Sequence, residues 1–315
     1  MAAYNVSTAS DGTLLYYAPN GLTYAANGDF ANCTISVCPV ELSVYGYRAS
    51  LPFSATLIAL YTLCAVAQTY LGWRYKTWSF MAAMLLGCFV ELLGYVGRIM
   101  MWQNPWNDGG FIMQIVLITI GPVFFSAAIY VMLYQIAMYI SPSSARFSPK
   151  IYYWIFIPCD IVSLILQAAG GALSSTSDGD SGPGVNIAIA GLVFQVVTLA
   201  TFIAATVDYA WTSRNVAAEK KQALKFKVFA GFFALATILI TIRCCYRVYE
   251  LSEGYSEDSE ALRDQPLFIG LEGMMVVLAA WCLVVAHPGP VFRSLEAKMA
   301  EKKIGAGSDS EGAIV

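Results

Sequence analysis

Long apolar segments follow one another along this chain and are separated by short polar stretches. Seven of them reach the length of about 20 residues that a helix needs to cross the hydrocarbon core of a bilayer. These segments cover residues 51–71, 79–101, 111–140, 151–173, 186–210, 226–251 and 266–286. The pattern predicts an all-α integral membrane protein, built as a bundle of seven transmembrane helices.

The composition supports this fold class. Of the 315 residues, 58% are hydrophobic and only 12% are charged, whereas about a quarter of the residues of soluble domains are charged. We therefore divide the chain into an N-terminal tail (1–50), a seven-helix transmembrane domain (51–286) and a C-terminal tail (287–315). The basic residues form no stripe that would bind nucleic acid. The partners expected from composition are membrane lipids.

The lysines and arginines between the predicted spans lie mostly on one side of the membrane. Thirteen of them fall in the loops after spans one, three and five, at Lys227 in the first turn of span six, or in the tail after span seven. The opposite side has only Arg48 and Arg263. Because basic loops stay in the cytoplasm, this asymmetry predicts an extracellular N-terminus and a cytoplasmic C-terminus.

The N-terminal tail has features of an extracellular segment. Two acceptor sequences for N-glycosylation begin at Asn5 and Asn32. Cys33 and Cys38 lie in the same tail and could form a disulfide outside the cell; two free thiols are the alternative, and the sequence leaves both open.

The remaining polar segments are loops and the end of the chain. Residues 174–186 and 252–265 are acidic and are expected to be extracellular loops. Residues 291–303 place apolar side chains on one helical face with basic residues around them. This segment is either a short helix on the inner membrane surface or a solvated tail.

The second span contains a carboxylate and a guanidinium, Glu91 and Arg98, within otherwise apolar sequence. Seven residues are close to two helical turns, so both side chains project from one face about 10 Å apart along the axis. A charge in hydrocarbon is costly and usually marks function. We expect Glu91 to pair with Arg98 or with an arginine of span six, and Arg98 to reach water. Gly94 and Gly97 leave room for a neighbouring helix or a ligand.

The spans after the second also carry candidate polar residues, many of them spaced three or four apart on one helix face. Together with Glu91 and Arg98, the candidates are Tyr95, Gln114, Tyr130, Asp160, Ser163, Gln167, Gln195, Arg243, Arg247, Glu250 and Glu272. The predicted orientation places most of them in the outer half of the membrane. They form either a structural network of paired charges or a headgroup site for a zwitterionic or cationic amphiphile.

The sequence lacks the residues that several classes of enzyme and cofactor-binding protein require. His287 is the single histidine, so one chain cannot supply a three-histidine zinc site or two axial histidines for a haem. Neither a G-x-x-x-x-G-K-[ST] phosphate loop nor a G-x-S-x-G elbow is present. We therefore expect no enzyme activity, cofactor or metal site, and interpret His287 as a turn residue at the membrane interface.

Four motifs in this order resemble the fungal RTA-like family, also called the lipid-translocating exporter family. They read 91-ELLGYVGR-98, 121-GPVFFSAAIY-130, 243-RCCYRVYE-250 and 287-HPG-289. The chain departs from the family pattern before span one, where it has Tyr47-Arg48-Ala49-Ser50, and in span seven, where Glu272 replaces an aspartate. The resemblance implies a seven-span plasma-membrane protein linked to stress and toxic-lipid resistance. Members of the family are associated with export of sphingoid long-chain bases, and one with porphyrin uptake.

The function that these observations favour is translocation of amphipathic lipids, such as a sphingoid long-chain base or a sterol-like compound. The alternative is a seven-span receptor for a lipid or small molecule. Against the receptor, the chain lacks an Asp-Arg-Tyr motif at the end of span three, where residues 137–141 read AMYIS. Span seven also lacks Asn-Pro-x-x-Tyr. A porphyrin transporter and a membrane enzyme rank below both.

Overall fold

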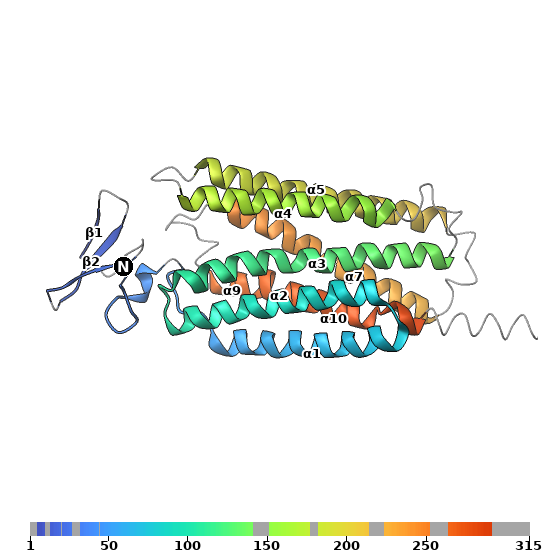
Figure 1. The fold of residues 1–315 in the computed structure, drawn as a ribbon, viewed down its shortest axis with the longest axis horizontal. Coiled ribbons are helices and arrows are strands. Elements are labelled where there is room, and N and C mark those ends of the chain that lie inside the picture. Colours follow the sequence, from blue (N-terminus) through green and yellow to red (C-terminus); the bar gives the residue numbers. More distant parts are fainter. Residues whose placement is uncertain are drawn as a thin grey trace, which may run out of the picture.

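The computed structural model describes residues 5–9, 13–19, 21–26, 32–43, 45–140, 151–176, 182–213, 224–252 and 264–291. Within these ranges, seven helical segments lie side by side in one bundle (Figure 1), and all seven are long and apolar enough to cross a membrane. This result confirms the predicted fold class. The first six are α1 (Leu51–Tyr75), α2 (Trp78–Gln103), α3 (Asp108–Ile140), α4 (Ile151–Thr176), α5 (Gly182–Thr212) and α7 (Leu224–Ser252).

The seventh segment is not a regular α-helix throughout. It begins with α9 (Gln265–Leu267), continues as a π-helix, η3 (Phe268–Met274), and ends with α10 (Met275–Val285). The π-helix contains Glu272, a candidate residue of the sequence. Because π-helical turns are uncommon and frequent at functional sites, this segment is a first indication of where the site lies.

A small antiparallel sheet lies at the end of the bundle where α1 begins, here called the N-terminal end (Figure 1). Its strands are β1 (Val6–Thr8), β2 (Leu14–Tyr17) and β3 (Thr23–Ala25), paired in that order. A disulfide joins Cys33 to Cys38. The short helix η1 (Val40–Leu42) comes next along the chain. Asn5 and Asn32 are exposed, so both remain predicted glycosylation sites.

Several helices extend beyond their predicted limits. The segment 174–186 was expected to be a loop, but α4 continues to Thr176 and α5 begins at Gly182. Pro183 is compatible with this start because the first turn of a helix has no use for the N–H that proline lacks. Within 252–265 the structure describes only the ends, and of the proposed surface helix 291–303 only Val291; the rest of both lies outside the described residues.

Glycines allow two pairs of helices to approach closely. A Cβ on Gly94 would contact Ile118 of α3, and one on Gly97 would lie 3.0 Å from the backbone nitrogen of Gln114. In the same way, Gly170 of α4 packs against the backbone of Ala188 on α5. The predicted space at Gly94 and Gly97 is therefore filled by a helix, as small residues commonly permit in membrane proteins.

His287 lies in the turn after α10, as the sequence predicted. Its Nδ1 accepts a hydrogen bond from the Gly289 N–H at 3.1 Å, and its Nε2 lies 3.2 Å from Thr77 Oγ1. Since Nδ1 is an acceptor, the neutral ring carries its proton on Nε2 and donates it to Thr77. The buried ring thus joins the end of α10 to the residue that precedes α2.

Candidate functional site

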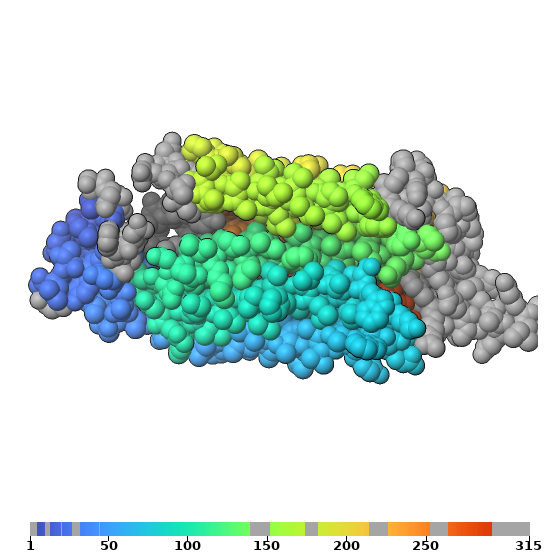
Figure 2. Space-filling view, in the orientation of Figure 1, coloured from blue at the N-terminus to red at the C-terminus, as the bar shows by residue number. Residues whose placement is uncertain are grey.

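A cavity of about 520 Å³, here called cavity 1, lies between α3, α4, α5 and α7 in the half of the bundle nearest the N-terminal end. Figure 2 shows the hollow between α4 and α3, with α7 in orange at its base. Aliphatic side chains form most of its wall, while Thr119, Gln167 and Arg247 are polar. An apolar cavity with few polar groups is the usual form of a small-molecule site.

The charged group of cavity 1 is an ion pair on α7. Arg247 Nη1 donates to Glu250 Oε2 at 2.7 Å, and both side chains are largely buried. The two residues are one helical turn apart, a separation at which side chains meet. Arg247 and Glu250 therefore share one face of α7, as the sequence predicted, and this places the Glu250 carboxylate beside the guanidinium that lines cavity 1.

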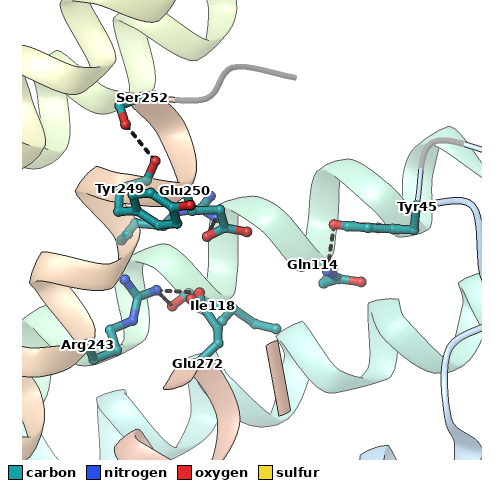
Figure 3. A network of polar contacts seen from close by, with 9 residues as sticks. Tyr45, Gln114, Ile118, Arg243, Tyr249, Glu250, Ser252 and Glu272 are labelled. Atoms are coloured by element: carbon teal, nitrogen blue, oxygen red, sulfur yellow. Dashed lines mark hydrogen bonds and ion pairs between the residues drawn. The ribbon is translucent and has the colours of Figure 1, made fainter. Parts of the chain in front are cut away.

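A second buried ion pair lies one turn earlier on α7. Arg243 Nη2 donates to Glu272 Oε1 of η3 at 2.6 Å and to the Ile118 carbonyl of α3 at 3.1 Å (Figure 3). Both charged side chains are 2% exposed. Since charges buried in this way must be paired to be tolerated, Arg243 links three elements of the bundle.

Three predicted polar residues of α4 and α5 form one hydrogen-bonded group. Gln167 Nε2 donates to Gln195 Oε1 at 3.1 Å and to Ser163 Oγ at 3.3 Å. Gln167 also lines cavity 1. The group connects the wall of the cavity to the interface between α4 and α5.

An aromatic cluster with one acid lies beyond the end of cavity 1. Tyr130 Oη donates to Asp160 Oδ2 at 2.9 Å. The Tyr130 ring lies 4.6 Å from Phe202 and 5.5 Å from Phe156, between ring centroids. Asp160 lies one turn along α4 from Leu164, which lines cavity 1. We call Tyr130, Phe156, Asp160 and Phe202 the aromatic plug.

A second cavity, cavity 2, of about 390 Å³ lies on the other side of the plug. It is bounded by α3, α5 and α7, from Leu133 and Ile136 to the first turns of α7 at Phe226, and it is almost entirely apolar. Along α3 and α5, Tyr130 and Phe202 of the aromatic plug lie between the residues that line cavity 1 and those that line cavity 2.

Arg98 does not reach water, contrary to the expectation from its place near the end of span two. Its side chain is 1% exposed, donates to Tyr47 Oη at 3.0 Å, and lies 3.7 Å from the ring centroid of Phe268. The segment that precedes α1 and the start of η3 cover the guanidinium. An arginine over an aromatic face gains a cation–π attraction, strongest when desolvated.

Gln114 is held by the same covering segment. Its Nε2 donates to Tyr45 Oη at 2.9 Å (Figure 3), and the Tyr45 ring packs against Phe111 at 5.6 Å. Burial raises the pKa of Tyr45 well above its usual value because the phenolate would lose its hydration. Tyr45 is therefore a neutral phenol that closes the N-terminal end of α3.

Glu91 was expected to pair with Arg98 or with an arginine of span six, and this prediction is wrong. Among the described residues, both of its carboxylate oxygens lack a hydrogen-bond partner, and the side chain is 0% exposed. Arg98 contacts Tyr47 instead, and Arg243 contacts Glu272. Tyr95 lies on the same helix, buried beside Tyr61 at 6.0 Å, and its hydroxyl is also without a partner in the described part of the chain.

Sequence reasoning missed the groups that complete these contacts. Tyr45 and Tyr47 come from the tail rather than a span, although Tyr47 belongs to the motif before span one. Phe268 and Phe202 were hidden among the many apolar positions of their helices, where an aromatic residue carries no distinctive signal.

Comparison with known proteins shows the family to which the chain belongs. The family model described as "RTA1 like protein" matches residues 84–295. The sphingoid long-chain base transporter RSB1 of Saccharomyces cerevisiae is 30% identical over 293 residues, covering 80% of this chain and 75% of the relative. Protein RTM1 of the same species is 28% identical and covers 74% and 76%.

A shorter match joins the chain to a protein with a different named cargo. Protoporphyrin uptake protein 1 of Saccharomyces cerevisiae is 28% identical, covering 54% of this chain and 56% of the relative. No solved structure matches. These relatives are named transporters or uptake proteins, except for RTM1, whose name states no activity.

Proposed function

This chain belongs to the RTA1-like family, and we propose that it moves amphipathic lipids across a membrane. The cargo class that we favour is a sphingoid long-chain base or a sterol-like compound, carried at the plasma membrane as part of resistance to toxic lipids. The relative named as a sphingoid long-chain base transporter supports this cargo.

Cavity 1 is the single observation in the structure that carries the proposal. A long hydrocarbon chain needs an apolar wall, and α3, α4 and α5 supply one through residues such as Ile115, Val116 and Leu192. The volume of about 520 Å³ lies within the range of small-molecule sites. The cavity therefore suits a single-chain amphiphile better than a polar solute.

The polar groups at the cavity suit the headgroup of such a molecule. A sphingoid base has an ammonium group and hydroxyls. The Glu250 carboxylate can accept hydrogen bonds from an ammonium if Arg247 yields one of its oxygens, and charge-assisted bonds of this kind are strong. The amide of Gln167, on the opposite wall, offers an acceptor to a hydroxyl, because its Oε1 has no hydrogen-bond partner among the described residues.

The two cavities suggest the route. Cargo in cavity 1 would pass the aromatic plug to reach cavity 2, because both spaces lie between α3, α5 and α7. Rotation of Tyr130 and Phe202 would open the way, and the Tyr130–Asp160 hydrogen bond holds the plug closed. Movement of this type, around a site between helices, is how many transporters work.

The test is exchange of a fluorescent sphingoid base between the leaflets of vesicles that contain the purified protein. Gly171 lines cavity 1, and a Cβ there would meet nothing within 4 Å. Gly171→Leu should therefore fill the cavity without disturbing helix packing, and we expect exchange to fall at least tenfold, as loss of about 1.4 kcal/mol of binding would produce.

Gly231→Leu is the matched control. Gly231 is also helical, exposed and open around its Cβ, but it lies outside both cavities. This variant should exchange cargo at the wild-type rate. Exchange by the wild-type protein no faster than in protein-free vesicles would refute transport. Binding without exchange would instead favour a receptor.

A further inference from the structure

Glu91 is a buried acid that the proposed transport route does not use. It lies midway along α2, and a Cβ on Gly121 of α3 would contact its carboxylate. Its side chain is 0% exposed, and within the described ranges neither of its oxygens has a hydrogen-bond partner. Buried polar groups are nearly always hydrogen-bonded, so this exception requires an explanation.

The charges around Glu91 do not balance it. The charged groups that act on it electrostatically are Arg243 of α7 and Glu272 of η3. Arg243 already forms an ion pair with Glu272 at 2.6 Å. One guanidinium therefore faces two carboxylates, and Glu272 holds it. The other titratable neighbours, from α1 and α2, are neutral in ordinary conditions: Tyr61, Cys88 and Tyr95.

A carboxylate without a cation in a membrane interior is too costly to remain ionised, and such groups become neutral by taking up a proton. We propose that Glu91 is a proton-binding site, and that its protonation is coupled to movement of the cargo. This inference rests on the proposed transport function for the coupling, but not for the proton site itself.

Proton-accessible groups extend from Glu91 in both directions along the interface of α1 and α2. On α2, one turn from Glu91 toward the N-terminal end, lies the Tyr95 hydroxyl. On α1, the Tyr61 hydroxyl lies close enough to Glu91 and Tyr95 to interact with both electrostatically, and the Gln68 amide lies two turns further toward the opposite end. All of these atoms are buried and, in the part of the chain that the structure describes, without a hydrogen-bond partner. A hydroxyl can accept one proton while it gives up another, so Tyr61 and Tyr95 are the groups that can pass a proton to or from Glu91.

Arg243 connects the proton site to the cargo site. With Glu91 neutral, Arg243 binds Glu272 and the Ile118 carbonyl, which is the arrangement observed. Loss of the proton creates a second carboxylate that competes for this guanidinium and draws it from α3. Arg247, one turn further along α7, lines cavity 1. Movement of α7 at Arg243 therefore changes the cavity, and by linkage the cargo changes the proton affinity of Glu91.

Infrared difference spectroscopy of the purified protein tests the proton site directly. At neutral pH the wild-type protein should show the carbonyl band of a neutral carboxylic acid, and Glu91→Gln should lose it. Glu41→Gln, which removes an exposed carboxylate of the N-terminal segment, should keep it. Adding a sphingoid base should shift the pH at which the band disappears. A wild-type protein without the band, or a band that cargo leaves unchanged, overturns the proposal.

Vesicles with an imposed pH gradient test the coupling. The probe is a fluorescent sphingoid base with a trimethylated nitrogen, so that its own charge does not depend on pH. One proton per cargo molecule would let a gradient of one pH unit drive an approximately tenfold difference in cargo concentration. Glu91→Gln, which mimics the protonated acid, should still exchange cargo without a gradient but lose the response to it.

The outcomes separate the two proposals. Exchange in the wild-type protein that ignores the gradient, or a gradient response that Glu91→Gln retains, overturns the coupling. No exchange of the unmodified base at all refutes the proposed transport function, while the carboxylic acid band still decides whether Glu91 holds a proton.

Discussion

The two faces of α3 differ in how they meet their neighbours. Toward α2, glycines bring the backbones together, so that a Cβ on Gly97 would lie 3.0 Å from the Gly110 carbonyl. Toward α4, α5 and α7, the same helix lines cavity 1 with Ile115, Val116 and Thr119. One face is closed by backbone contact, whereas the other, here called the open face, is crossed by side chains: Arg243 reaches the Ile118 carbonyl, and Tyr130 reaches Asp160.

This difference indicates which parts of the bundle can move. Interfaces built on glycine leave little freedom because their atoms already touch. The pair α2 and α3, and the pair α4 and α5 joined at Gly170, should each behave as one body. The space between them contains the cavities and the aromatic plug. Relative motion of the two pairs is therefore the change that a transport cycle would use.

Removing Arg243, whose guanidinium joins α7 to both η3 and the open face of α3, should have the largest effect on stability. Arg243→Ala leaves the Glu272 carboxylate buried without its cation, and breaking a buried pair costs about 3–5 kcal/mol. Thermal unfolding in detergent measures the loss. The control is Lys227→Ala on the same helix, where the side chain is exposed and the change should stay within about 0.5 kcal/mol. Equal melting temperatures for both variants would mean that Arg243 does not hold the open face.

Enlarging a residue on the closed face should have the next largest effect. Gly97→Leu would force side-chain atoms into the backbone of α3, and overpacking typically costs about 1–3 kcal/mol. The same melting assay reports it. If Gly97→Leu proved as stable as the wild-type protein, the closed face would be looser than the contacts indicate.

The hydrogen bond between Tyr45 and Gln114 near the start of α3 should contribute less to stability than either of these contacts. Tyr45→Phe removes the acceptor of Gln114 Nε2, which costs about 1 kcal/mol at neutral pH. The raised pKa of Tyr45 means that its contribution is complete below the unfolded value near 10 and declines as pH rises above it. The difference in unfolding free energy between the wild-type protein and Tyr45→Phe should therefore become smaller in alkaline solution. A constant gap from pH 7 to pH 11 would contradict this account.

Filling the open face should change stability least and function most. Gly171→Leu meets no neighbouring atom at its Cβ, and replacing a helix-interior glycine gains at most about 1 kcal/mol. We expect an unchanged or slightly raised melting temperature together with loss of lipid exchange. A fall in stability comparable to that of Gly97→Leu would show that the two faces are packed alike.

The sequence predicted many of the individual residues of the candidate site, but it did not predict which of them contact one another. Polar residues within apolar spans identified Arg243, Arg247, Glu250 and Glu272, and the helical period placed the first three on one face. The partner of Glu91 could not be predicted in this way. Seven residues along one helix separate Glu91 from Arg98 by about 10 Å, so any contact depends on neighbouring helices.

The tail before α1 shows the same limit. Nothing in the sequence indicated that Tyr45 and Tyr47 fold back over the ends of α2 and α3. Their hydroxyls bind Gln114 and Arg98, and this cover is why Arg98 is buried rather than hydrated. A hydropathy pattern identifies the spans, but the residues that cover the ends of α2 and α3 lie outside the spans and leave no mark in that pattern.

By itself, the sequence determined the seven apolar helices and the set of polar residues within them, because a bilayer demands about 20 apolar residues per span and makes each exception visible. Only the tertiary structure decided the pairing, the two cavities and the isolation of Glu91. Pairing depends on which helices are neighbours and how closely glycines let them approach. Those are distances between segments far apart in the chain, which no local pattern records.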